Sequence, residues 1–287
     1  MPFTLRLALA FFIAAIAAAI IAPLAAVAVA AAGFHFPFPR IFDRTVMVTL
    51  AAMLILWARR LGVARLLRRG FAHPMGNVGA VGRGLLTAAA VIAILLGLAA
   101  IFGGKIEMRG AEALARAPKY IGGAILIAII EEGFFRAVLL GGMVPDFGRT
   151  AALVVSAAVY AAAHVVRAPA RYYVSGYDRM AGLHNLSASF AQLTHPAHAL
   201  PALIGLFLLG LVLGEAFLVT GNVYHSAGLH AGLVLGAKLW PFGKAPATSP
   251  PLWIAGYGRP ALISGAAAWL LALAILVLIP RFAGRRT

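Results

Sequence analysis

The sequence predicts an all-α fold, a polytopic integral membrane bundle of about eight transmembrane helices. Hydrophobic residues make up 63% of the chain and charged residues only 11%, and the mean hydropathy is +0.96. Soluble domains are far more polar. The apolar residues also fall in runs of about 20, the length that a helix needs to cross a hydrocarbon core of ~30 Å. Helices are expected because lipid offers no hydrogen-bond partner, and a helix satisfies its backbone N–H and C=O groups internally.

The expected membrane helices are eight apolar runs bounded by charge, Gly or Pro. They span 5–32, 44–62, 84–103, 119–144, 149–167, 199–219, 223–240 and 260–280. The first follows Arg6 and ends in an Ala-rich stretch, as a signal peptide does, but its apolar run exceeds the ~7–15 residues of a signal-peptide core. We therefore interpret it as a transmembrane helix. Without repeats or large insertions, residues 1–287 are expected to form a single integral membrane domain.

The chain is strongly basic, with a formal net charge of +16 and no cysteine. The basic residues lie in short loops beside apolar runs, so we interpret them as topology signals and lipid-headgroup contacts rather than as a nucleic-acid surface. The dense block from Arg59 to Arg69 and the Arg-rich tail favour cytoplasmic termini in a cell (inner) membrane. The absence of cysteine excludes disulfides, thiolate metal sites and a cysteine nucleophile.

Adjacent acids interrupt the fourth apolar run at Glu131 and Glu132. An ionisable group near the bilayer centre costs from ~2.5 to more than ~10 kcal/mol, so such groups usually have a function. Residues four apart share a helical face, so Glu132 can pair with Arg136, whereas Glu131 is turned by about 100°. A carboxyl group without a cation in low dielectric can exchange a proton near neutral pH, as a general base must. The alternatives are a neutralised structural brace for Glu132 and Arg136 and a hydrogen-bonded, protonated Glu131.

A turn signal at 145–148 predicts that the fourth and fifth runs form an antiparallel hairpin. Counting from this turn at ~1.5 Å per residue, Glu131 and His164 differ by only about 5 Å in depth. Tyr160 lies one turn before His164 on the same face. We therefore expect Glu131 and His164 to meet, although a lone membrane histidine often serves only as a helix-to-helix hydrogen-bonding group.

The seventh run contains His225 and His230, which project about 140° apart. Gly228, Gly232 and Gly236 form a small-residue stripe suited to close helix packing, on roughly the side of His225. His230 is about 7.5 Å deeper, nearer the level of the glutamates. His230 is thus the candidate site residue, and His225 is expected to be interfacial.

Two further groups of polar residues are assigned structural roles. Glu215, after the close-packing motif Gly210-x-x-x-Gly214, is expected to be paired or hydrogen-bonded. His184, His195 and His198 lack a regular ligand spacing, so we interpret 184–198 as a loop rather than a metal site.

The residues Glu131-Glu132-x-x-x-Arg136, Tyr160-x-x-x-His164 and His230-Ala-Gly-Leu-Val234 occur in this order. Together they resemble the motifs of the CPBP (Abi) intramembrane proteases, a family that includes the type II CAAX prenyl endopeptidases. The resemblance covers about 119–240.

It implies peptide-bond hydrolysis within the membrane. By analogy with the matching motif positions of the family, Glu131 and His164 would activate water, while Glu132 and Arg136 would organise the site. His230 would polarise the carbonyl or stabilise its oxygen in the transition state.

Two positions depart from the family pattern. Tyr160 replaces the usual Phe and keeps an aromatic ring, and Val234 stands at the possible oxyanion-side position where Asn is common. Loss of one oxyanion donor costs ~2.7–4 kcal/mol of barrier unless another group replaces it. The family is often called a metalloprotease, and two histidines with a glutamate could bind zinc. However, no His-Glu-x-x-His spacing occurs, so we favour catalysis that requires no metal, with zinc as the alternative.

Two other functions are compatible with the same residues. Buried Glu and His also form the proton relays of coupled transporters, although no inverted repeat is visible. A catalytically inactive binding or immunity-type protein could keep the polar cluster as a brace. The expected partners are membrane lipid and a membrane-associated protein or peptide substrate, not nucleic acid.

Overall fold

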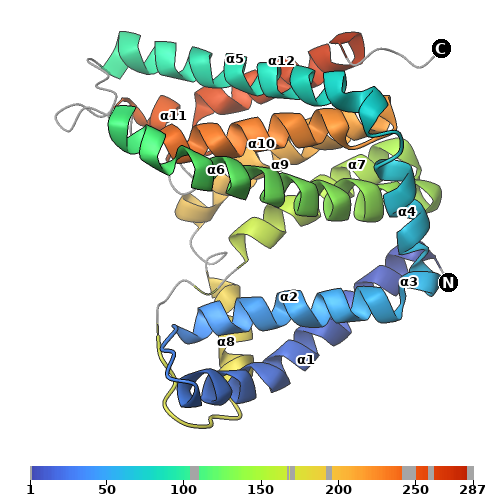
Figure 1. The fold of residues 1–287 in the computed structure, drawn as a ribbon, viewed down its shortest axis with the longest axis vertical. Helices are drawn as coiled ribbons and strands as arrows, with labels where there is room; N and C mark the ends of the chain where they lie inside the picture. The colour runs from blue at the N-terminus through green and yellow to red at the C-terminus, as the bar shows by residue number, and fades with distance from the viewer. Residues whose placement is uncertain are drawn as a thin grey trace. The chain divides into compact units, whose positions relative to one another are not determined.

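The computed structural model describes residues 2–103, 110–166, 168, 172–191, 196–240, 250–257 and 262–282. All regular secondary structure in these residues is helical, which confirms the predicted all-α fold (Figure 1). Each of the eight predicted apolar runs coincides largely with helix. Contacts divide the chain into two compact units, 1–64 with 162–199 and 65–161 with 200–287. The expectation of a single domain stays a prediction.

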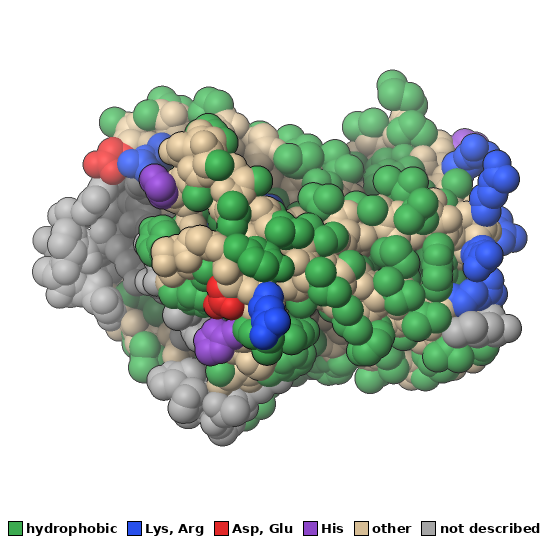
Figure 2. Space-filling view, turned by 90° about the horizontal axis from the view of Figure 1, so that it is seen from below, with side chains coloured by type: hydrophobic (Ala, Val, Ile, Leu, Met, Phe, Trp, Pro, Cys, Tyr) green, Lys and Arg blue, Asp and Glu red, His purple; other side chains and the backbone are tan. Residues whose placement is uncertain are grey.

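The described helices have the lengths and surfaces of a membrane protein. Three of them, Phe3–Ala31, Met75–Gly103 and Ala199–Thr220, are long and apolar enough to span a bilayer, and Ala266–Ile279 is a shorter apolar helix. Many large apolar side chains are exposed, including Leu86 at 71% and Ile130 at 55%, and Figure 2 shows apolar side chains spread over the face that it displays. Monomeric soluble proteins rarely expose so much apolar surface. The chain is an integral membrane protein.

The first unit contains α1 (Phe3–Ala31), α2 (Phe38–Leu56), α3 (Ala58–Leu61) and α8 (Ala181–Ser189). Its core joins small residues of α1, such as Ala19 and Ala22, to Phe38 and Phe42 of α2. Helix α8 packs on α1, where Gly182 leaves no room for a side chain against the Ala19 carbonyl.

The position of α8 corrects the predicted loop at 184–198. His184 lies on this helix, because a small, partly apolar face of 181–189 is buried against α1. His195 lies outside the described residues.

The second unit holds the remaining helices. They are α4 (Val63–Gly70), η1 (Met75–Asn77), α5 (Val78–Gly103), α6 (Gly110–Glu131), η2 (Glu132–Leu140), α7 (Gly141–Val165), α9 (Pro196–Thr220), α10 (Tyr224–Leu239), α11 (Leu252–Ala255) and α12 (Ala266–Phe282); residues at the unit boundary belong to α4, α7 and α9. Helix α10 packs against both α5 and α6 (Figure 1). This central position brings α10 next to the glutamate pair.

The predicted small-residue stripe of α10 is the surface that contacts α5. A Cβ atom on Gly228 would lie 2.2 Å from the Val81 carbonyl oxygen, and one on Gly232 would lie 2.4 Å from Cβ of Ala88. Only glycine permits the two backbones to approach this closely. The stripe therefore fixes the rotation of α10 about its axis.

The predicted turn before the fifth run is present inside the segment labelled α7. Gly148 has φ 74° and ψ 171°, a conformation that interrupts the helix and that other residues rarely adopt. Beyond it the chain returns along η2, since the rings of Tyr160 and Phe135 are 5.0 Å apart. The antiparallel hairpin is confirmed.

Candidate active site

The candidate active site begins at a local change of helix type. Residues Glu132–Leu140, which lie inside the predicted helical run 119–144, form a π-helix rather than an α-helix. At its end the Gly141 N–H donates to the Arg136 carbonyl, five residues earlier. A wider turn rotates neighbouring side chains by less than the 100° of an α-helix, and segments of this type frequently occur at functional sites.

The predicted pair of Glu132 and Arg136 is present. Nε of Arg136 lies 3.3 Å from Oε2 of Glu132, and both side chains are almost completely buried. The contact is an ion pair without hydrogen-bond geometry, and neither atom has a hydrogen-bond partner among the described residues. The guanidinium carbon of Arg136 also lies 4.6 Å from the ring centroid of Tyr160, a cation–π contact. Arg136 is therefore held between a carboxylate and an aromatic ring.

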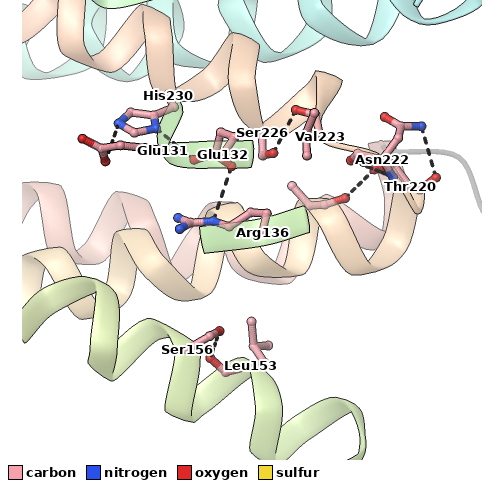
Figure 3. Close-up of polar contacts among 11 residues, drawn as sticks. Glu131, Glu132, Arg136, Leu153, Ser156, Thr220, Asn222, Val223, Ser226 and His230 are labelled. Carbon is pink, nitrogen blue, oxygen red and sulfur yellow. Dashed lines mark hydrogen bonds and ion pairs between the residues drawn. The ribbon is translucent and has the colours of Figure 1, made fainter. Parts of the chain in front are cut away.

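His230 lies between the two glutamates. Its Nδ1 is 2.9 Å from Oε1 of Glu132 and its Nε2 is 3.8 Å from Oε2 of Glu131 (Figure 3). Glu131 and Glu132 thus reach opposite nitrogens of one imidazole, whereas an α-helical spacing predicted that Glu131 would face elsewhere. The last residue of α6 and the first of η2 can share this partner because α10 packs directly beside them.

Exposure distinguishes the two carboxylates. The Glu131 side chain is 25% exposed, while Glu132 is at 0% and His230 at 4%. Arg136, Glu132 and His230 are therefore buried, whereas part of the Glu131 side chain is accessible from outside the protein, although its Oε2, which faces His230, is buried. A base that must bind and deprotonate water needs such access.

Tyr160 and Val234 flank the cluster. Tyr160 is 1% exposed, and its ring centroid is 6.4 Å from that of His230 in an edge-on arrangement. Val234 lies one turn after His230 on α10 and is partly buried. Its side chain has no hydrogen-bond donor.

His225 and His164 also lie in predicted membrane helices, on α10 and α7. His225 is buried on the α5 side, where a Cβ on Gly84 would collide with its carbonyl oxygen. His164 lies one turn after Tyr160 on α7 and is partly buried, but it is grouped with the first unit. Its approach to Glu131 stays a prediction.

Within the described residues, no group of three or more His, Cys, Asp or Glu side chains is arranged to hold a metal ion. Nδ1 of His230 faces Glu132, and its Nε2 faces Glu131.

Glu215 has the structural pairing that the sequence predicted. Its Oε1 lies 2.5 Å from Nη2 of Arg149, and the same guanidinium donates to the Leu218 carbonyl. The pair joins α9 to the start of the second half of the hairpin. It contributes no group to the cluster around His230.

Comparison with known proteins covers the same part of the chain. The family model described as type II CAAX prenyl endopeptidase Rce1-like matches residues 113–235. This range is less than half of the chain, but it contains the glutamate pair, Tyr160, His164, His230 and Val234. No curated protein and no solved structure matches the chain. The family resemblance predicted from the three motifs is confirmed over 113–235.

Proposed function

We propose, from the match of residues 113–235 to the Rce1-like type II CAAX prenyl endopeptidases, that the chain is an intramembrane endopeptidase. It would hydrolyse a peptide bond near the carboxy terminus of a membrane-associated protein or peptide. The observation that carries the proposal is the position of Glu131, partly exposed and 3.8 Å from Nε2 of His230 at the edge of a buried ion pair.

In the proposed mechanism Glu131 is the general base. Water bound beside its carboxylate gives up a proton to Glu131 as the water oxygen attacks the carbonyl carbon of the peptide bond. Collapse of the tetrahedral intermediate breaks the C–N bond, and Glu131 returns the proton to the leaving amine. By the family resemblance, His164 would orient the attacking water.

His230 would stabilise the developing oxyanion. When both ring nitrogens carry protons, Nδ1–H donates to Glu132 and Nε2–H is directed to the space beside Glu131, where the carbonyl oxygen would lie. Glu132 holds the ring in place, and Arg136 balances the charge of Glu132. This arrangement resembles the way in which a buried carboxylate orients a catalytic histidine.

The remaining assignments follow from composition and sequence. We propose that the protein lies in the cell (inner) membrane with both termini cytoplasmic, that it contacts membrane lipid and a protein or peptide substrate but no nucleic acid, and that catalysis requires no metal. The match to an endopeptidase family favours hydrolysis over proton-coupled transport or a purely binding role.

The direct test uses the purified full chain in liposomes with a prenylated carboxy-terminal peptide and its unprenylated analogue. Mass spectrometry should detect two products whose summed mass exceeds that of the peptide by one water. Preference for the prenylated peptide would support the CAAX-type substrate class. Intact peptides, together with proton flux that Glu131→Gln abolishes, would overturn the proposal in favour of a transporter.

A further inference from the structure

Helix α4 (Val63–Gly70) has two chemically distinct faces. Arg65, Arg68 and Arg69, spaced i, i+3 and i+4, lie on one face and are exposed. Leu66 and Leu67 lie on the other and are partly buried. Helix α4 is therefore strongly amphipathic, with its basic side chains gathered on one face.

The apolar face of α4 packs on the outer surface of η2. A Cβ on Gly133 would lie 3.3 Å from Cε2 of Phe71, the residue after α4, and Gly70 leaves no room for a side chain beside Ala137. Gly141 lies near Leu66 in the same way, with 3.8 Å between its Cβ position and Cδ2. Since residues 133, 137 and 141 are all small, α4 can approach the helix that carries Glu132 and Arg136.

Backbone hydrogen bonds attach the end of α4 to the start of α10. The Val223 N–H donates to the Gly70 carbonyl at 3.0 Å, and the Tyr224 hydroxyl donates to the Phe71 carbonyl at 2.8 Å. The apolar face of α4 is therefore covered by protein. Its arginines are exposed, and none of them forms an ion pair or hydrogen bond with another side chain of the described residues.

The location of the arginines indicates what they bind. The candidate span Met75–Gly103 begins five residues after α4, so α4 lies where the chain meets the membrane surface. Figure 2 shows exposed Lys and Arg side chains gathered along one edge of the face that it displays. Guanidinium groups form paired hydrogen bonds with phosphate oxygens, and each basic residue beside an anionic leaflet strengthens binding about five-fold.

We propose that the face formed by Arg65, Arg68 and Arg69 is a binding surface for the phosphate headgroups of anionic phospholipids. Bound headgroups would hold α4 at the membrane surface and so maintain its packing on η2. This inference does not depend on proteolytic activity, because it rests on the charge and packing of α4 alone.

The test uses the full chain in nanodiscs and exploits the absence of cysteine. A fluorophore on Ala64→Cys, an exposed position of α4, reports quenching by spin-labelled phosphatidylglycerol or phosphatidylcholine at equal mole fraction. We expect phosphatidylglycerol to bind at least about five-fold more strongly near the fluorophore, with the preference falling as salt is raised. The triple variant R65Q/R68Q/R69Q should lose the preference, and R65K/R68K/R69K should keep most of it.

The matched control R40Q/R44Q/R179Q removes the same charge from exposed arginines elsewhere and should keep the full preference. It also separates a local site from a general effect of net charge. Two results would overturn the proposal. One is equal quenching by the two lipids in the labelled protein that keeps all its arginines. The other is an undiminished preference for phosphatidylglycerol in R65Q/R68Q/R69Q with unchanged thermal stability. Binding of an acidic peptide in place of the lipid preference would assign the surface to a protein partner and would also overturn it.

Discussion

Nδ1 of His230 lies 2.9 Å from Oε1 of Glu132, and both side chains are almost fully buried. This contact joins two helices, η2 and α10, whose motifs are 98 residues apart. The guanidinium of Arg136 balances the charge of the Glu132 carboxylate. A charged group that would be unfavourable in lipid is thereby accommodated inside the protein. The same imidazole presents its second nitrogen to Glu131.

The first prediction concerns the buried pair. Glu132→Gln should destabilise the protein by ~3–5 kcal/mol, because it leaves the Arg136 charge buried and unpaired. The double variant E132Q/R136M should recover part of this loss. Equilibrium unfolding in mixed micelles measures both free energies.

The pair of Arg149 and Glu215 provides the control, since the Arg149 side chain is 48% exposed. Glu215→Gln should cost no more than ~1 kcal/mol. If Glu132→Gln were no more destabilising than Glu215→Gln, the buried pair would not carry the role assigned to it.

A second prediction concerns the contact of α10 with α5. Gly228→Ala should destabilise the protein by at least ~1–3 kcal/mol through overpacking, because its Cβ would meet the Val81 carbonyl. Gly122→Ala on α6 should be neutral or stabilising by up to ~1 kcal/mol, since open space surrounds that position and alanine favours helix. Thermal unfolding of the two variants compares them, and equal effects would contradict the close packing.

Much of this fold could be predicted from local sequence. Apolar run lengths located the helices, and the Gly148 turn located the hairpin, because both signals depend on neighbouring residues alone. The i, i+4 spacing likewise predicted the ion pair of Glu132 and Arg136. Helix α8 was missed because only its packing on α1 buries its short, weakly apolar face.

The partner of Glu131 could not be predicted from spacing. The π-helix at 132–140 changes the direction of the side chains, and the rotation of α10 depends on the glycine contact with α5. Both are tertiary effects. One signal was available, since Gly133, Ala137 and Gly141 recur every four residues and mark the surface on which α4 packs.

A third prediction addresses the departure at Val234. If this position faces the carbonyl oxygen, Val234→Asn should increase kcat by up to ~10²–10³, because it restores an amide donor. Val234→Ala, which changes volume without adding a donor, should not. Rates of peptide cleavage in liposomes decide the matter, and an unchanged rate for Val234→Asn would place the oxyanion elsewhere.

Metal removal is the basis of a fourth prediction. A mechanism in which Glu131 activates water without a metal predicts that cleavage persists after treatment with EDTA or 1,10-phenanthroline. Added zinc should not increase the rate. Loss of activity that zinc restores would instead support the zinc alternative, with ligands arranged differently from the cluster around His230.

The central claim is that Glu131 is the base of a peptide hydrolase, and the rate of cleavage by Glu131→Gln tests it most directly. Gln keeps the size of the side chain but cannot accept the proton, so the rate should fall by ~10²–10⁴ while thermal stability is retained. Glu112→Gln, at an exposed acid on the same helix, should cleave the peptide at the unsubstituted rate. Cleavage by Glu131→Gln at the rate of Glu112→Gln would contradict the account.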